Sequence, residues 1–229
     1  MQSVVPTCLL VGVIAACHTS DPNSPDASTV TGDGSNDSRV GLALTWSSQP
    51  ATIPGEVDSN ISVASMLFRV ANLRVIGDAG PGDTRTSVDQ IQVAWGQSGS
   101  HEPIRFGDAP SGLYSHVVML VEGNITDYSY EITGTAKVDG NMKPFRIRDL
   151  SPLGISMDTS AMLEPGQQTS LGIEVRIDQA LQSLDFAHLN EQNGTLTLET
   201  FDDGIGDFRG KLMDSVFRTD HPVENSGPH

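Results

Sequence analysis

The acidic segment Asp202–Asp207 is the best candidate in the sequence for binding a metal ion. Asp202 and Asp203 are followed by Gly-Ile-Gly and then by Asp207, a composition that suits an exposed turn. Calcium prefers about six to eight oxygen ligands, several of them carboxylates. These three aspartates are therefore the candidate calcium ligands of the sequence. The interpretation that we favour is an acidic, glycine-rich hairpin tip that binds no ion.

The order of residues from Asp203 to Asp207 is similar to the end of the calcium-binding aspartate loops of the thrombospondin type-3 kind. That similarity covers only the end of such a loop. The upstream positions, where these loops place aspartates, hold Glu199 and Phe201. A phenylalanine side chain cannot ligate a cation, so the calcium-binding pattern is incomplete. Calcium is the only cofactor that the sequence suggests.

The other reactive side chains show no catalytic spacing. The six histidines contain no pair at i,i+2 on a strand or i,i+4 on a helix, although zinc needs about three or four His, Cys or carboxylate ligands. His116 is expected at the rim or in the core, on one face with Tyr114. The glycines of Gly96–Ser100 lack the spacing of a nucleophile elbow. The sequence therefore predicts no enzyme, and an exported hydrolase is the remaining alternative.

Aromatic residues make up 5% of the chain, whereas sugar-binding sites usually present exposed aromatic platforms. Trp46 and Trp95 stand in phase with apolar residues of predicted strands, so we expect both in the core. Tyr128 and Tyr130 share a predicted strand face with Ile132. They form either a small platform or, as we expect, part of the core. The identity of the ligand, protein or glycan, stays open.

Cys17 is the residue with the clearest chemistry. The apolar stretch Cys8–Ala16 is far shorter than the ~20 residues of a membrane-spanning helix, but it fits the apolar region of a signal peptide. Ile14-Ala15-Ala16-Cys17 resembles the lipobox of bacterial lipoproteins, which implies cleavage before Cys17 and acylation of its thiol and amino group. An ordinary secretory signal that happens to contain a cysteine is the alternative.

The cysteine count agrees with the lipobox. The chain has two cysteines, and cleavage would remove Cys8, so Cys17 would keep no disulfide partner. Several acyl chains on one residue would hold the protein at the lipid bilayer. Because His18 and not an aspartate follows Cys17, lipoproteins in general suggest the outer membrane. The net charge of −16 argues against nucleic acid as a partner.

The elements that would position these residues are strands. Apolar residues alternate with small or polar ones in four clear segments, and turn residues separate shorter runs. We predict an all-β fold, an antiparallel sandwich of the prealbumin-like or immunoglobulin-like kind with eight or nine strands and one short helix. A phase slip near Asn72 indicates a bulge. The clearest strands are 40–46, 66–76, 91–95 and 171–177.

Turn chemistry predicts two hairpins. Asp139-Gly140-Asn141 would join strands 128–138 and 142–148, and the acidic segment would join strands 195–201 and 208–217. The helix is expected at 178–189, capped by Asp178. The resulting organisation is a signal peptide at 1–16, a lipidated Cys17 with a disordered tether at 17–39, a sandwich at 40–217 and a disordered tail at 218–229.

One segment resembles a known fold family. In Phe106–Val121, the residues Pro110, Gly112 and Tyr114 look like the Pro-x-Gly-x-Tyr turn that launches a strand in prealbumin-like (transthyretin-like) sandwiches. The wider layout of residues 40–186 is similar to a domain-of-unknown-function family of bacterial lipoproteins with that fold. The shared features include the turn Glu164-Pro165-Gly166. The resemblance implies an exported sandwich and brings no catalytic residues.

Overall fold

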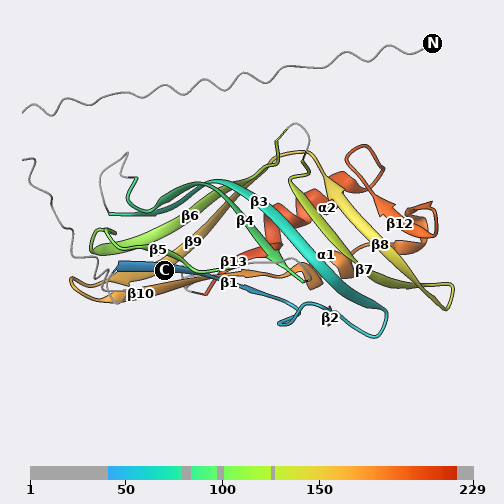
Figure 1. Ribbon diagram of the computed structural model, residues 1–229, viewed down its shortest axis with the longest axis horizontal. Helices are drawn as coiled ribbons and strands as arrows, with labels where there is room; N and C mark the ends of the chain where they lie inside the picture. Colours follow the sequence, from blue (N-terminus) through green and yellow to red (C-terminus); the bar gives the residue numbers. More distant parts are fainter. Residues whose placement is uncertain (1–40, 79–83, 97–100, 125–126, 221–229) are drawn as a thin grey trace, which may run out of the picture. The chain divides into compact units, whose positions relative to one another are not determined.

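The structure, a computed structural model, describes residues 41–78, 84–96, 101–124 and 127–220. Within these residues, thirteen strands form two sheets (Figure 1). The predicted all-β sandwich is therefore confirmed, although its strands outnumber the expected eight or nine.

The smaller sheet has the strand order β13-β10-β1-β5. Its two central strands overlap the predicted segments 40–46 and 171–177, of which the second ends earlier than expected, and they run parallel to each other, contrary to a purely antiparallel sandwich. The outer strands β5 and β13 pair with them antiparallel. The four strands are β1 Gly41–Ser48, β5 Ile104–Phe106, β10 Gln168–Val175 and β13 Phe217–Thr219.

The larger sheet has the order β11-β12-β8-β7-β3-β6-β9, and β2 and β4 also pair with β3. Its ladders are antiparallel except for β12 beside β8, which is parallel. The strands are β2 Gly55–Glu56, β3 Ile61–Gly77, β4 Ser87–Trp95, β6 Gly112–Val121, β7 Tyr130–Val138, β8 Asn141–Asp149, β9 Leu153–Leu163, β11 Asn190–Gln192 and β12 Thr195–Leu198.

The long strand β3 divides the larger sheet into two arms. Its first half pairs with β7 and its second half with β6, and both partners lie on the edge opposite β4. Arg69 stands at the division: its N–H donates to the Ser129 carbonyl at 2.9 Å, and its carbonyl accepts from the Glu122 N–H at 2.8 Å. The predicted bulge is confirmed by a register shift next to Asn72, which has a φ of +51°.

Helical segments pack beside the β7–β8 arm (Figure 1). The ring of Phe208 lies 6.3 Å from that of Tyr130, and the ring of Phe186 lies 5.1 Å from that of Phe145. This arm is thus covered by helical side chains and not by a second sheet. The segments are α1 Ile177–Gln182, the 3₁₀-helix η1 Phe186–His188, α2 Ile205–Lys211 and the π-helix η2 Leu212–Val216.

The predicted second hairpin is wrong, because 208–216 is helical and only Phe217 enters a strand. The buried residues Ile205, Phe208, Leu212 and Val216 recur every three or four positions, which is the helical period. Strand β12 instead lies between β11 and β8, so neither of its edges is free to pair with 208–217. The predicted helix at 178–189 is shorter than expected, and Arg176, not Asp178, occupies its N-cap.

The first hairpin is confirmed. Asp139 and Gly140, with φ of +50° and +83°, form the two-residue turn, and Val138 pairs with Asn141. Two positive φ values in a two-residue turn are typical of type I′, whose twist matches that of the flanking strands.

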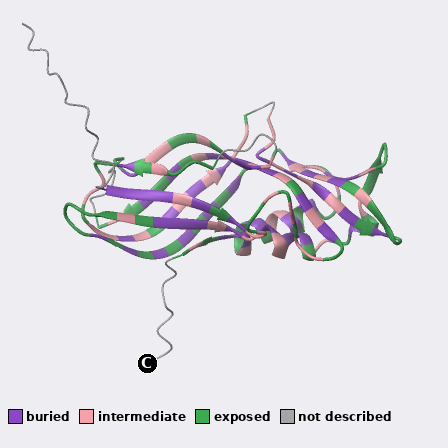
Figure 2. Cartoon of the chain, turned by 60° about the horizontal axis from the view of Figure 1, so that its bottom comes forward, coloured by how far each residue is buried: buried purple, intermediate pink, exposed green. Residues whose placement is uncertain are grey.

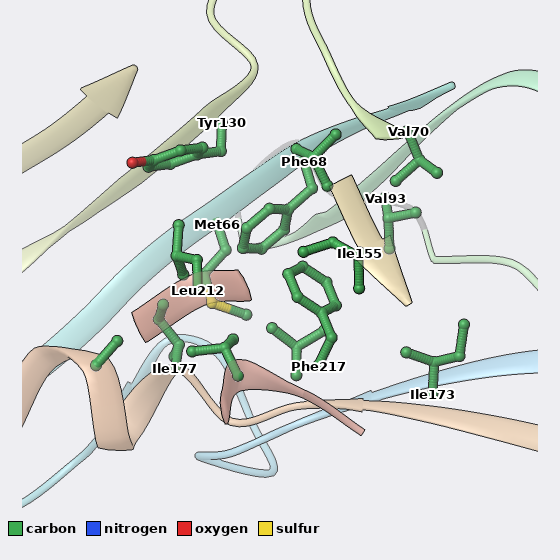
Figure 3. Packing of buried hydrophobic residues seen from close by; sticks show 14 of the residues in the cluster. Met66, Phe68, Val70, Val93, Tyr130, Ile155, Ile173, Ile177, Leu212 and Phe217 are labelled. Carbon is green, nitrogen blue, oxygen red and sulfur yellow. The ribbon is translucent and has the colours of Figure 1, made fainter. Parts of the chain in front are cut away.

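The core is continuous from the sandwich into the helical segments. Figure 2 shows buried and exposed positions alternating along the strands, as a sheet with one buried face requires. In Figure 3, Phe68 lies between Tyr130 and Phe217, and its ring meets that of Phe217 edge-on at 5.3 Å. The side chains of Ile177 and Leu212 extend the same cluster into α1 and η2.

A tight turn leads into β6 at Pro110–Tyr114. Strand β6 begins at Gly112, whose φ is +141°, and the Tyr114 hydroxyl donates to the Pro110 carbonyl at 2.7 Å. The turn Glu164-Pro165-Gly166 joins β9 of the larger sheet to β10 of the smaller one, with φ of +73° at Gly166.

Candidate functional site

The two tryptophans of the chain line one pocket. Trp46 comes from β1 of the smaller sheet, and Trp95 is the last residue of β4 in the larger sheet. The cavity volume is about 570 Å³, within the range of small-molecule sites. We call it the tryptophan pocket; it is lined by Trp46, Ser47, Ser48, Gln49, Ala51, Thr52, Ile53, Trp95, Gly96, His101 and Glu174.

Gln49 fixes one wall of the tryptophan pocket. Its backbone N–H donates to the Val175 carbonyl at 2.9 Å, and its carbonyl accepts from the Asp178 N–H at 3.2 Å. Its side-chain amide donates to Glu174 at 3.1 Å. The Ser48 hydroxyl donates to the Pro50 carbonyl at 2.8 Å. These bonds tie the segment to β10 and α1, so the position of this wall is fixed.

The opposite wall is built at the end of β4. The imidazole of His101 stacks on the Trp95 ring at 5.1 Å and 18°, and its Nδ1 lies 3.3 Å from the Ala94 carbonyl. Gly96 has a φ of +98°, and a Cβ there would meet the Ala64 carbonyl at 2.5 Å. Glycine is therefore required where this wall approaches β3.

The indole N–H of Trp46 is a buried donor within the wall of the pocket. Trp46 is only 7% exposed, and its nitrogen has no hydrogen-bond partner among the described residues. A buried donor without a partner costs about 1–3 kcal/mol. Such groups are rare in native structures.

A second cluster joins β8 to α2. The Asp149 carboxylate has no exposed side-chain surface and accepts hydrogen bonds from Arg209 Nε at 2.8 Å, the Ser151 N–H at 3.0 Å and the Tyr130 hydroxyl at 3.3 Å. The cluster contains both an acidic and a basic side chain, but both oxygens of the Asp149 carboxylate already accept hydrogen bonds. The ion pair joins α2 to the larger sheet.

The pKa directions in this cluster follow from burial and pairing. Burial would raise the pKa of Asp149, but the hydrogen bonds from Arg209 and Ser151 outweigh it and lower that pKa below its ordinary value of 3.8. The bond to Asp149 raises the pKa of Arg209. Burial, and then the charge of Asp149, raise the pKa of Tyr130, so the phenol stays a neutral donor.

The predicted calcium ligands lie at the start of α2. The Asp202 carboxylate already accepts from the Asn190 amide at 2.8 Å and from the Glu199 N–H at 2.7 Å. Asp207 belongs to the first turn of α2. In the described part of the chain, no three His, Cys, Asp or Glu side chains are grouped in a way that could hold a metal ion.

The calcium hypothesis stays a prediction with a direct test. Calorimetric titration of the full chain with calcium would give saturable heat if the loop binds the ion, and Asp203→Ala with Asp207→Ala would abolish it, because carboxylates supply most of the binding energy. A calcium response that both substitutions leave intact would place the ion elsewhere.

Two predictions about shared strand faces are wrong. A bulge between Tyr114 and His116 turns Tyr114 into the core and His116 outward, where its Nδ1 lies 2.9 Å from Asp158. Tyr128 precedes β7, and its ring lies 4.3 Å beneath the Arg148 guanidinium. Only Tyr130 is buried, so the expectation of a core residue is confirmed for it alone.

Sequence reasoning missed the tryptophan pocket. The expected burial of Trp46 and Trp95 is confirmed, but the sequence does not show that they meet, nor that Gln49, His101 and Glu174 join them. The usable signal was that both tryptophans lie at or near the ends of their predicted strands.

Cys17 lies outside the described residues, so its modification stays a prediction. None of the helices in the described ranges has the length and apolarity needed to cross a bilayer. Comparison of the chain with protein-family models, curated proteins and solved structures finds no match.

Proposed function

We propose that this protein is an exported, lipid-anchored binding module of the bacterial cell envelope, without catalytic activity. Acylated Cys17 would hold it in the membrane, which His18 suggests is the outer one. The polar segment 18–39 would act as a flexible tether of the domain.

A single observation carries the binding role: the two tryptophans of the chain, one from each sheet, line the same preorganised pocket. Pockets of this size with aromatic walls and a few fixed polar groups are the usual form of a ligand site. The partner would be a glycan or a protein side chain that enters the pocket. The net charge of −16 makes nucleic acid a poor partner.

The anchor is tested by replacing Cys17 with serine. We expect Cys17→Ser to move the protein from the membrane fraction to the soluble exported fraction, because the thiol that starts the modification is gone. The matched control is Cys8→Ser, which changes the other cysteine and should leave fractionation unaltered. Intact-mass measurement should show acyl chains on the wild type and on Cys8→Ser. An uncleaved, unmodified wild type would contradict the proposal.

The binding role has its own experiment. Immobilised full-length protein is incubated with envelope extract, and captured glycans and proteins are identified. We expect Gly96→Val to lose the captured partner, because its side chain would collide with β3 at the pocket wall. Gly154→Val is the control, since a Cβ there meets nothing within 4 Å. Equal capture by both variants would place binding elsewhere.

A further inference from the structure

We infer that this protein pairs with a second copy of itself through β4, whose outer edge joins the same edge of the other chain in an antiparallel ladder. The pairing goes beyond the proposed binding role and does not depend on the tryptophan pocket. Three features of β4 support it: the open backbone groups of its outer edge, the side chains along that edge, and a register in which two copies fit.

The outer edge of β4 presents backbone groups without partners. Strand β4 lies beside β3 (Figure 1), and among the described residues no strand pairs with its other edge. Arg69 of β3 lies opposite Gln92, but its N–H donates to the Ser129 carbonyl and its carbonyl accepts from the Glu122 N–H, both on the far side of β3. Arg69 and Gln92 are therefore a non-hydrogen-bonded pair, and the backbone groups of Gln92 point outward. The alternation of an antiparallel ladder gives those of Gln90 the same direction.

The other sheet edges of the described chain are short or covered. Strands β2, β5, β11 and β13 have only two or three residues each. The eleven-residue strand β9 is bridged to the smaller sheet, because the Thr169 hydroxyl donates to the Met162 carbonyl at 2.7 Å and the Thr219 hydroxyl to the Asp158 carbonyl at 2.8 Å. The nine-residue strand β4 is therefore the long edge that these ranges leave open.

The side chains of β4 do little to keep another strand away. Natural edge strands are protected by charges, especially lysine, by proline or by bulges. Strand β4 has one charged residue, Asp89, and neither lysine nor proline, and no register shift interrupts its ladder with β3. Gln90 and Gln92 are exposed, and Ile91 between them is only partly buried. A second strand would therefore meet little charge and would cover the remaining apolar surface of Ile91.

Two copies of β4 fit together with a two-fold axis through Ile91. Gln90 of each chain then lies opposite Gln92 of the other, and both pairs exchange backbone hydrogen bonds because these groups point outward. The side-chain amides of each glutamine pair meet on one face and can bond to each other. The two Ile91 side chains meet at the axis as a close, non-hydrogen-bonded pair. Asp89 lies opposite Val93, so the two carboxylates stay apart.

The net charge of −16 sets how strongly the copies pair. Two such chains repel each other, so the dimer is weak at low ionic strength. Added salt screens this repulsion and leaves the backbone hydrogen bonds, so the dimer tightens as salt rises. An interface held by ion pairs would loosen instead.

Sedimentation equilibrium measures the pairing. The full-length Cys8→Ser, Cys17→Ser variant is used, because it has no thiol for acylation or for other disulfides. We expect a monomer–dimer equilibrium with a Kd of about 0.1 mM, as for a small transient interface, and a lower Kd at about 0.5 M salt than at about 0.05 M. A chain that stays monomeric up to about 1 mM, or a dimer that loosens with salt, would overturn the inference.

A single introduced cysteine tests the register. In the same background, Ile91→Cys places two thiols across the axis with Cα atoms about 4.5 Å apart, within reach of a disulfide. Asp89→Cys is the matched control on the same strand. Because Asp89 lies opposite Val93, its two thiols would be separated by about four strand residues, or roughly 13 Å. We expect mild oxidation to give at least about ten times more disulfide dimer with Ile91→Cys. Equal yields, or no dimer from either variant, would overturn the inference.

Lysines on the edge should break the dimer. Gln90→Lys with Gln92→Lys sets lysine opposite lysine in both pairs and should raise the Kd at least about tenfold. Both side chains are exposed, so the midpoint of urea denaturation should stay unchanged. Gln167→Lys with Gln168→Lys is the control, because it adds the same charge at exposed positions away from β4 and should not raise the Kd. A Kd that the lysines on β4 leave unaltered would overturn the use of this edge.

Discussion

Replacing Arg209 by methionine is expected to lower the free energy of unfolding by about 3 kcal/mol at neutral pH. The substitution leaves the Asp149 carboxylate, which has no exposed side-chain surface, without its positive partner. The expected loss lies at the low end of the range for broken buried ion pairs because the Arg209 side chain is 27% exposed. Urea denaturation of the full chain measures it.

Two further variants show that the lost charge partner is the cause. Lys211→Met removes an exposed positive charge from the same helix and should change stability by less than about 0.5 kcal/mol. The double variant Asp149→Asn with Arg209→Met should lose less stability than Arg209→Met alone, since no charge stays buried. Equal losses for Arg209→Met and Lys211→Met would contradict the proposed role of the pair.

The same pair sets a dependence on pH. The folded pKa of Asp149 is lowered, so its contribution to stability is present above the unfolded value of 3.8 and is lost as pH falls below that value toward the folded pKa. At such acidity the carboxylate becomes protonated in wild type and variant alike. The stability difference between wild type and Arg209→Met should therefore shrink below about pH 4.

Replacing Phe208 by alanine is expected to cost about 3–5 kcal/mol. Phe208 is 1% exposed, and its ring lies 6.3 Å from that of Tyr130, so truncation opens a cavity between α2 and β7. Phe201→Ala is the matched control, because Phe201 is 94% exposed and its removal should cost less than about 0.5 kcal/mol. The midpoints of urea denaturation compare the two.

This prediction tests the arrangement of the helical segments. If 208–217 were the strand that the sequence indicated, Phe208 would sit on a hairpin edge and its truncation would cost little. A loss for Phe208→Ala no larger than that for Phe201→Ala would therefore contradict the helix packing of α2 on the β7–β8 arm.

The strands were predicted correctly and the second hairpin wrongly for the same physical reason, namely that the sequence shows only local patterns. Alternating apolar residues in β1 and β10 need only a buried face, so their local pattern sufficed. In 205–216, the glycine-rich acidic turn favoured a hairpin, but the segment could have its apolar side chains buried as a helix against Tyr130 and its neighbours. Whether the segment forms a hairpin strand or a helix depends on the sheet that it covers, and the strands of that sheet are distant in sequence.

By itself, the sequence determined the β-rich class, the bulge near Asn72, the Asp139–Gly140 hairpin and the burial of both tryptophans, since each depends on local periodicity or turn chemistry. Only the tertiary structure decided that β1 and β10 run parallel, that His116 and Tyr114 face opposite ways, and that Trp46 and Trp95 meet in one pocket. Those features arise from pairing between strands far apart in the chain, and local patterns do not specify a partner.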